Sequence, residues 1–161
     1  RWQDVKVFSL FCEELSMLDP LTQLPNQRAL ERILAQLKQD QGYPCSFMLI
    51  NISGLEKVTN TLGVALSEQV TIELLYQVSL KLSTEELLIN RNTNQYIIFC
   101  PKGNDESNNV LIEEIKKIEL SSRFTALKSI KVECVAKTLH KFEDLKSIFE
   151  QLDDKLLDLQ H

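Results

Sequence analysis

Apolar residues follow two different periods along this chain, and together the two periods predict a domain of mixed helices and strands. Six stretches repeat apolar residues every three or four positions, which is typical of one face of an α-helix: residues 2–18, 26–40, 55–62, 65–83, 110–119 and 142–159. Four shorter runs are continuous or alternating in the way of β-strands: residues 45–52, 87–91, 95–100 and 130–136. Helices and strands in this order predict an α/β (α+β) layered domain around one sheet.

The strand-like runs differ in how they distribute apolar residues. Cys45–Ile52 is almost continuously apolar, which predicts a strand buried on both faces. The run that ends at Arg91 and the run that begins at Gln95 are separated only by residues 92–94, and this favours a β-hairpin. Residues 130–136 largely alternate apolar and polar positions, so we expect one buried face and one partly wet face.

The helical stretches carry apolar stripes, and a polar loop is predicted at residues 103–109. The core positions that we expect are Leu30, Ile33, Leu34, Leu37, Val70, Leu74 or Leu75, Val78, Leu82, Leu111, Ile115, Ile118, Phe142, Leu145, Phe149, Leu152, Leu156 and Leu159. In residues 2–18 the stripe is a short seam of Val5, Phe8, Cys12 and Leu15. Two interpretations of this seam stay open: a coiled coil, or an amphipathic helix packed on its own domain.

Composition and charge narrow the classes of function. The 161 residues are 43% hydrophobic and 25% charged, which suits one globular domain with its own core. The formal charge of −5 and the absence of a dense Lys/Arg run argue against direct binding to nucleic acid. No apolar run approaches the roughly 18–20 residues that span a bilayer, and no signal-peptide pattern is present. The chain begins with Arg1 rather than Met, so we expect a piece of a longer protein.

The cysteines and histidines offer no metal-binding pattern. The four cysteines form no CxxC pair and the two histidines are far apart; they are Cys12, Cys45, Cys100, Cys134, His140 and His161. Three of the cysteines lie in apolar strand-like runs, so we expect buried, reduced thiols in a cytosolic domain rather than a redox role. We expect neither a metal nor a cofactor.

Residues 19–28 carry the first motif that resembles a known family. They read DPLTQLPNQR, which is similar to the D-x-L-T-G-L-x-N-R-R motif of the GGDEF family of bacterial diguanylate cyclases, with departures at Gln23 and Gln27. Two prolines break the preceding helix and predict an ordered turn. We expect this turn to dock the leading helix onto the domain, with Asn26 and Arg28 available for hydrogen bonds.

Residues 51–68 and the predicted hairpin extend the resemblance. NISGLEKVTNTLGVALSE aligns without a gap with the family pattern D-x-D-x-F-K-x-x-N-D-x-x-G-H-x-x-G-D, in which Gly63 is the one identity. Softer matches are Leu55, Asn60 and Glu68. The G-G-D/E-E-F signature falls on Asn92, Thr93, Asn94, Gln95 and Tyr96, where only Tyr96 is similar. The resemblance covers residues 19–160 and implies a nucleotidyl-cyclase-like domain: a mixed, mainly antiparallel sheet of about five strands flanked by helices.

The resemblance also implies a reaction whose chemistry this sequence does not support. Active relatives join two GTP molecules into cyclic di-GMP, with Mg²⁺ on carboxylates at the end of the first strand and in the hairpin. Mg²⁺ prefers anionic oxygen ligands. The corresponding residues here are all neutral: Asn51, Ser53, Asn94 and Gln95. Because neutral ligands do not offset the charge of the metal, we expect a catalytically inactive domain and not an enzyme.

The residues that meet the substrate in relatives are altered as well. The phosphate-binding Lys corresponds to Glu56, whose carboxylate would repel a triphosphate, and the guanine-reading Asn and Asp correspond to Thr59 and Glu68. A late Lys corresponds to Gln160, and the R-x-x-D inhibitory motif falls on residues 83–86, which contain no arginine. In the hairpin, Asn92 and Thr93 replace two glycines. We therefore expect a turn of different type or length, because a β-branched residue disfavours positive φ. A plain structural role stays open for each of these side chains.

We predict a linker or signalling helix at residues 1–18 and a degenerate GGDEF domain at 19–161. The expected function is that of a non-catalytic regulatory domain in a larger bacterial signalling protein. It would act in dimerisation or relay a signal to a neighbouring domain. The partner would be a second copy, or an EAL-type or sensor domain in the same chain. We expect a cytoplasmic location without membrane contact, which also suits the cytoplasmic part of a membrane-anchored protein. The alternative is a GTP-binding sensor without turnover, for which Gly63 and Glu68 remain.

Overall fold

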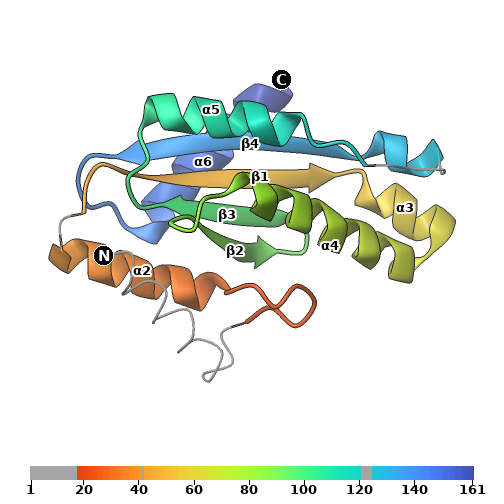
Figure 1. Cartoon of the computed structure of the whole chain (residues 1–161), viewed down its shortest axis with the longest axis horizontal. Coiled ribbons are helices and arrows are strands. Elements are labelled where there is room, and N and C mark those ends of the chain that lie inside the picture. Colours follow the sequence, from red (N-terminus) through yellow and green to blue (C-terminus); the bar gives the residue numbers. More distant parts are fainter. Residues whose placement is uncertain (1–17, 41, 121–124) are drawn as a thin grey trace.

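The computed structural model describes residues 18–40, 42–120 and 125–161, and these form one sheet with helices on both faces (Figure 1). The elements in chain order are α2 (Gln27–Asp40), β1 (Cys45–Ser53), α3 (Leu55–Leu62), α4 (Val64–Lys81), β2 (Leu87–Asn92), β3 (Gln95–Cys100), α5 (Asp105–Lys116), a 3-10 turn η1 (Thr125–Ser129), β4 (Lys131–Leu139) and α6 (Leu145–Gln160). Residues 1–17, which contain the predicted leading helix, lie outside the described residues.

The sheet has the strand order β2-β3-β1-β4, and every described pair is antiparallel. The predicted class, an α+β domain with a mainly antiparallel sheet, is confirmed. The described residues form four strands where the resemblance implied about five. β1 is an interior strand, hydrogen-bonded to β3 on one side and to β4 on the other, and its side chains contribute to both faces of the sheet.

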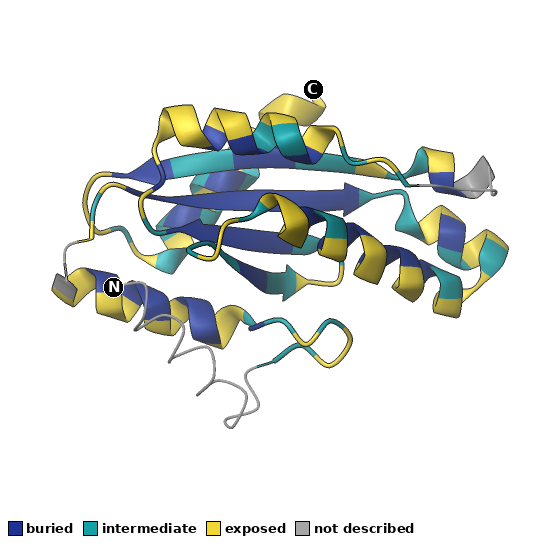
Figure 2. Ribbon diagram, viewed as in Figure 1, coloured by how far each residue is buried: buried dark blue, intermediate teal, exposed yellow. Residues whose placement is uncertain are grey.

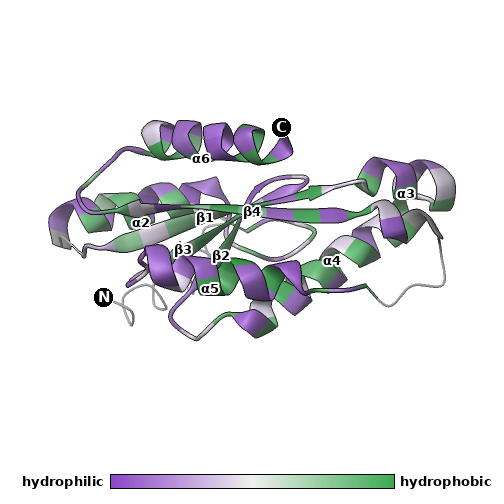
Figure 3. Cartoon of the chain, turned by 90° about the horizontal axis from the view of Figure 1, so that it is seen from above, coloured by the Kyte–Doolittle hydropathy of each residue, from purple (hydrophilic) through white to green (hydrophobic). Residues whose placement is uncertain are grey.

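Side chains of β1 alternate between two apolar layers. Met48, Ile50 and Ile52 belong to one buried cluster with α4 and α5. Phe47 and Leu49 belong to a second cluster with α2 and α6. Figure 3 views the sheet from above, with α6 on one side and α4 and α5 on the other. Figure 2 shows β1 buried along almost its whole length, as its nearly continuous apolar run predicted, and Ser53 at its end is half-buried.

The N-terminal end of α5 corrects the predicted loop at residues 103–109. The helix begins at Asp105, five residues before the predicted start at Val110. The Asn104 side chain accepts a hydrogen bond from Ser107 N at 2.8 Å, and Ser107 Oγ accepts one from Asn104 N at 3.0 Å. This reciprocal capping satisfies amide groups that would otherwise lack partners, so a polar sequence starts a helix here.

The last helix also differs from its prediction. It begins at Leu145 after the cap Asp144, so Phe142 precedes it and is 37% exposed. Its buried row is Ile148, Leu152 and Leu156, whereas Leu159 is exposed. The predicted stripe did not include Ile148, but its members Leu145 and Phe149 are partly buried against the same cluster. By contrast, the predicted core positions of α2 (Leu30, Ile33, Leu34 and Leu37) are all buried.

The turn before α2 docks on the edge strand β2. Thr22 donates from its N and Oγ1 to Asp19 Oδ2 at 2.9 and 2.7 Å, and Asn90 N donates to the Pro25 carbonyl at 2.7 Å. Asn26 Oδ1 accepts from Arg28 N at 3.0 Å, which is the predicted cap. Gln23 has φ 60, and it occupies the position where the family motif has Gly. Gln23 thus has a left-handed backbone conformation that is less favourable for it than for glycine.

Candidate functional site

The carboxyl end of β1 and the β2–β3 hairpin lie at the same end of the sheet (Figure 1). The hairpin is confirmed, and it turns through Thr93 and Asn94 between β2 and β3. Gln23 is the one non-glycine residue with positive φ among the described residues, so neither turn residue is left-handed. The register of β2 shifts between Asn90 and Asn92, and this irregularity closes the hairpin without the glycine conformations that the family signature permits.

Polar side chains from four strands and one helix form a continuous hydrogen-bonded row at this end, which we call the edge network. Asn92 Nδ2 donates to Gln95 Oε1 at 2.9 Å, and Gln95 Nε2 donates to Asn51 Oδ1 at 3.1 Å. Asn51 Nδ2 donates to Glu133 Oε1 at 3.3 Å, and Gln160 Nε2 donates to the same oxygen at 3.1 Å. The network therefore joins β2, β3, β1 and β4 to the end of α6.

Asn51 occupies the middle of the edge network and is 6% exposed. Gln95 and Glu133 are its direct cross-strand neighbours on β3 and β4. Its carbonyl oxygen accepts from one neighbour while its amide nitrogen donates to the other. Only a side chain with both an acceptor and a donor satisfies both neighbours, and an ionised carboxylate has no donor. The amide thus fits this position chemically.

These residues do not fit the magnesium site that the resemblance implies. Of the four predicted metal-site positions, Asn51 and Gln95 are brought together, but Gln95 donates a hydrogen bond to Asn51 and Asn51 donates one to Glu133. The one carboxylate of the network, Glu133, accepts two amide hydrogen bonds on a single oxygen. Ser53 is paired with Lys131 across β1 and β4, so this predicted metal position faces a basic residue rather than an acid.

Sequence reasoning missed Glu133. It lies in the middle of a strand predicted to have one wet face, and no sequence signal distinguishes it from other charges on such a face. The antiparallel register of β1 and β4 places it opposite Asn51. Glu133 could have been predicted only from the register of β1 against β4. The alternation of apolar and polar residues in a strand does not specify that register.

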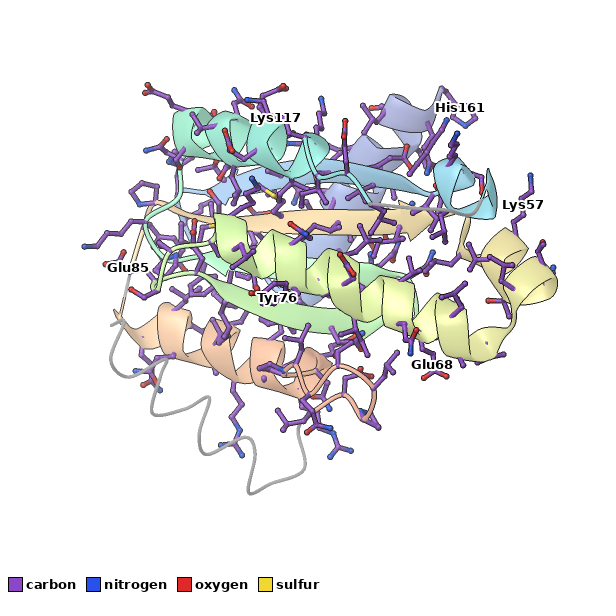
Figure 4. The ribbon with its side chains drawn as sticks, turned by 45° about the vertical axis from the view of Figure 1, so that its right-hand side comes forward. Lys57, Glu68, Tyr76, Glu85, Lys117 and His161 are labelled. Carbon is purple, nitrogen blue, oxygen red and sulfur yellow. The ribbon has the colours of Figure 1, made fainter. Side chains whose placement is uncertain are left out.

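Most of the predicted substrate-contact and nucleotide-binding positions lie on α3, on α4 and at the glycine between them, whereas Gln160 lies at the end of α6 in the edge network. Glu56 and Glu68 are exposed, and Figure 4 marks Glu68 along α4. Thr59 Oγ1 donates within its own helix to the Leu55 carbonyl at 3.0 Å. Gly63 has φ 96, and a Cβ there would have no neighbour within 4 Å. The surviving glycine is thus explained by backbone conformation, which only glycine adopts readily.

Tyr96 belongs to the core rather than to the candidate site. It is 1% exposed and lies in the cluster with α4 and α5, on the opposite face of the sheet from Asn51. Burial, together with the nearby charge of Asp19, raises the pKa of Tyr96 to about 12, although a hydrogen bond with Asn90 acts in the lowering direction. The similarity to the family signature at this position therefore reflects packing.

The three cysteines of the described residues are buried and unpaired, as predicted. Burial raises the pKa of the Cys45 and Cys134 thiols to about 12 and raises that of Cys100 further. Thiols of this kind stay protonated at neutral pH and are poor nucleophiles. No helix within the described ranges has both the length and the apolar character needed to cross a membrane.

An antiparallel sheet layered between helices, with a hairpin that meets the end of the interior strand β1, defines a nucleotidyl-cyclase-like domain. The family profile described as "Diguanylate cyclase, GGDEF domain" matches residues 16–159. The chain therefore belongs to the GGDEF family, whose members occur in cyclic di-GMP signalling proteins. A search of curated proteins found no significant match.

Solved structures share this fold at low sequence identity. Diguanylate cyclase SiaD from Pseudomonas aeruginosa, solved with its activator SiaC, superposes with TM-score 0.79 at 18% identity over 98% of this chain and 63% of that chain. The GGDEF domain of DgcB from Caulobacter crescentus, in complex with c-di-GMP, superposes with TM-score 0.76 at 19% identity, over 90% of this chain and 88% of that chain. Vibrio cholerae LapD, as an S helix-GGDEF-EAL chain bound to c-di-GMP, superposes with TM-score 0.71 at 13% identity, over 95% of this chain and 36% of that chain. The chain thus spans less than two thirds of SiaD and about a third of that LapD chain.

Proposed function

We propose that this chain is a GGDEF domain without cyclase activity, which acts as a regulatory domain of a larger bacterial signalling protein. The observation that carries the proposal is the edge network. The positions that should hold Mg²⁺ are the amides of Asn51 and Gln95, and they are engaged in hydrogen bonds that hold the sheet edge together. Phosphoryl-type transfer depends on positioned charge around the phosphates, and the network offers one carboxylate, already bound by two donors.

The partner that we propose is either a second copy of the chain or a neighbouring domain of the same protein, of EAL or sensor type. LapD supports this, since its GGDEF domain lies in one chain with an S helix and an EAL domain. SiaD supports the general point that such domains work with other proteins, since it was solved with its activator SiaC. In this role the domain would transmit a change of position or pairing rather than a product.

The first test is a product assay. We expect purified chain at high concentration, incubated with GTP and Mg²⁺ or Mn²⁺, to form no cyclic di-GMP by chromatography, because the metal-binding carboxylates are replaced. Diguanylate cyclase SiaD with its activator SiaC, assayed in parallel, is the positive control. Formation of cyclic di-GMP above the enzyme-free background would overturn the proposal.

The second test separates the regulatory domain from a GTP sensor without turnover. Calorimetric titration with GTP and Mg²⁺ should give no binding heat, because Glu56 stands where a phosphate-binding Lys is expected and Gly63 is kept for its backbone conformation. Saturable binding without product would select the sensor instead. If GTP binds and the Glu56→Lys variant binds it more tightly, the phosphates lie near α3.

A further inference from the structure

The edge network has a direction, because each of its three strand amides accepts at its oxygen and donates at its nitrogen. Asn94 N donates to Asn92 Oδ1 at 3.1 Å, and Asn92 Nδ2 donates to Gln95 Oε1 at 2.9 Å. Gln95 Nε2 donates to Asn51 Oδ1 at 3.1 Å, and Asn51 Nδ2 donates to Glu133 Oε1 at 3.3 Å. Four successive hydrogen bonds, which we call the amide row, thus run one way from the tip of the hairpin to β4.

The two ends of the amide row cannot exchange their roles. The backbone N–H of Asn94 is a donor only, and the ionised carboxylate of Glu133 is an acceptor only. An amide side chain between them can present either its oxygen or its nitrogen after a half turn, so the ends determine which way it faces. Both ends impose the same direction here, and every hydrogen bond of the amide row is satisfied.

Burial in the middle of the amide row makes its direction costly to change. Asn51 is 6% exposed and lies between Gln95 and Glu133. If its amide alone turned, its oxygen would face the Glu133 oxygen and its nitrogen would face the Gln95 nitrogen. Two hydrogen bonds would be lost at a position where water does not easily replace them. The amides of the row therefore keep or reverse their direction together.

We propose that Glu133 is a positioning residue for the β2–β3 hairpin. Its acceptor oxygen, acting through the amides of the row, keeps the Asn92 oxygen on the Asn94 N–H and so fixes the turn. Glu133 is on β4, which is separated from the hairpin by β1. Gln160, at the end of α6, donates to the same Glu133 oxygen. The proposal rests on the regulatory function proposed above, and it names the residues through which a change at the end of α6 would reach the hairpin.

The hairpin end of the amide row is also connected to the turn before α2. Asn90 Nδ2 donates to the Asn92 carbonyl at 2.9 Å, and Asn90 N donates to the Pro25 carbonyl at 2.7 Å. Hydrogen bonds therefore extend from the turn before α2, across the end of the sheet, to the end of α6. Such a contiguous arrangement with two possible directions suits a domain that transmits a change of position.

Replacing the acceptor with a donor should move the effect to the hairpin. In Glu133→Lys both ends of the amide row are donors, because an ammonium group has no acceptor. Three amides between two donors cannot all be satisfied, so one hydrogen bond must be lost. The loss costs least at Asn92, which is exposed to water, and most at Asn51, which is buried. We therefore expect the three amides to reverse and the Asn94 N–H to lose its acceptor.

Solvent-exchange NMR of the full chain tests this expectation at the Asn94 backbone amide. Glu133→Lys should raise its exchange rate by about threefold to tenfold, the loss of one ordinary hydrogen bond. Glu133→Gln should exchange as the wild type does, because its side-chain oxygen still accepts from Asn51. Glu150→Lys is the matched control, since Glu150 is exposed on α6 outside the network and the change of charge is the same. It should leave the Asn94 rate unchanged.

Breaking the amide row in its middle separates transmission through it from a long-range effect of charge. Gln95→Met removes the amide and keeps a side chain of similar length. In this background the exchange rate of the Asn94 amide should no longer depend on whether residue 133 is Glu or Lys. Circular dichroism on heating checks that each variant folds.

Nuclear Overhauser effects test the direction in the wild type, without any substitution. The side-chain amide protons of Asn51 should be close to the methylene protons of Glu133, and those of Gln95 should be close to the Asn51 Cβ protons. The reverse pattern, with the Asn51 amide protons close to the Gln95 methylene protons instead, would overturn the proposal.

Three results with the variants would also overturn it. They are an unchanged Asn94 rate in Glu133→Lys, a Glu133→Gln variant that exchanges as fast as Glu133→Lys, and an effect of Glu133→Lys that persists in the Gln95→Met background. None of these results bears on cyclase activity. Failure of the proposed positioning role and failure of the proposed function are therefore distinguishable, because NMR decides the first and the product assay decides the second.

Discussion

At the scale of single residues, Asn51 has a structural role at a position where the family pattern has an aspartate. Its amide connects Gln95, which donates to it, with Glu133, which accepts from it. An aspartate would keep the acceptor but lose the donor, and it would face Glu133 directly across β1 and β4. The neighbouring side chains thus stabilise an amide at this position and would destabilise the aspartate that the family pattern has there.

Restoring the family residue should therefore destabilise the domain. We expect Asn51→Asp to lower the free energy of unfolding at pH 7 by about 1–3 kcal/mol, because two carboxylates would meet at a position that is largely buried. Repulsion from Glu133 would raise the folded-state pKa of the introduced carboxyl. Stability from a raised pKa is present at low pH and lost as pH rises, so the deficit should shrink toward pH 4. Urea unfolding from pH 4 to 8 measures it.

Glu133→Gln provides the control for this experiment. In the double variant, the introduced carboxylate faces an amide that donates to it, so most of the stability at pH 7 should return. A double variant as unstable as Asn51→Asp would show that repulsion by Glu133 is not the cause. A single Asn51→Asp variant as stable as the wild type would show that the edge network does not constrain this position.

At the scale of elements, α6 is fixed to the sheet by charged side chains that cross between them. Arg91 on β2 donates from both terminal nitrogens to Asp153 on α6, at 2.6 and 2.9 Å. The Arg91 guanidinium also lies 4.2 Å from the centre of the Phe149 ring. The Arg91 side chain is 16% exposed, so this contact is better shielded from water than an ordinary surface pair. It holds the middle of α6, while Gln160 holds its end.

The geometry of this contact predicts that lysine is a poor substitute for arginine. We expect Arg91→Lys to lower the free energy of unfolding by about 1–2 kcal/mol, because an ammonium makes no paired hydrogen bonds and does not stack on the ring in the same way. Denaturant unfolding measures the loss. Lys116→Gln is the control, since it breaks the exposed Lys116–Glu113 pair, and such pairs contribute little. Equal stability of the wild type and Arg91→Lys would contradict the prediction.

At the scale of the whole molecule, the sheet is covered on both faces, and buried thiols lie in both apolar layers. Cys45 belongs to the layer with α2 and α6, whereas Cys100 and Cys134 belong to the layer with α4 and α5. Burial raises the pKa of all three thiols, and this opposition to ionisation exists in the folded state only. Ionisation of these thiols is therefore less favourable in the folded than in the unfolded chain, so the stability of the domain depends on pH.

The free energy of unfolding should fall as pH rises above about 8.5, where thiols of the unfolded chain begin to ionise. The pKa of the folded Cys45 and Cys134 thiols is about 12, so between these values the unfolded state binds fewer protons. Each thiol then lowers stability by about 1.4 kcal/mol per pH unit. Urea unfolding at pH 8, 9 and 10 measures the slope. Cys134→Ala should reduce it by one thiol's share, and an unchanged slope would contradict the assignment.

The pattern of the sequence determined most of the elements and the inner faces of α2 and α4. It did so because burial imposes a period of two on strands and about 3.6 on helices, and this period is written in the chain itself. The motif at residues 19–28 and the gapless match at 51–68 identified the family for a related reason. Turn and strand-end positions impose local backbone requirements that do not depend on catalysis, as Gly63 illustrates.

Other features depended on contacts between residues distant in sequence, and only the tertiary structure decided them. Strand register placed Glu133 beside Asn51, and no period in the sequence specifies which residues of two strands are opposite. The packing of α6 on the sheet decided that Ile148 is buried, whereas Phe142 precedes the helix and is exposed. Helix α4 has two apolar sides, and its packing on the sheet decided that Tyr76 lies outside. The chain's periodicity marks which residues avoid water, whereas the packing of the elements determines which of them are still exposed.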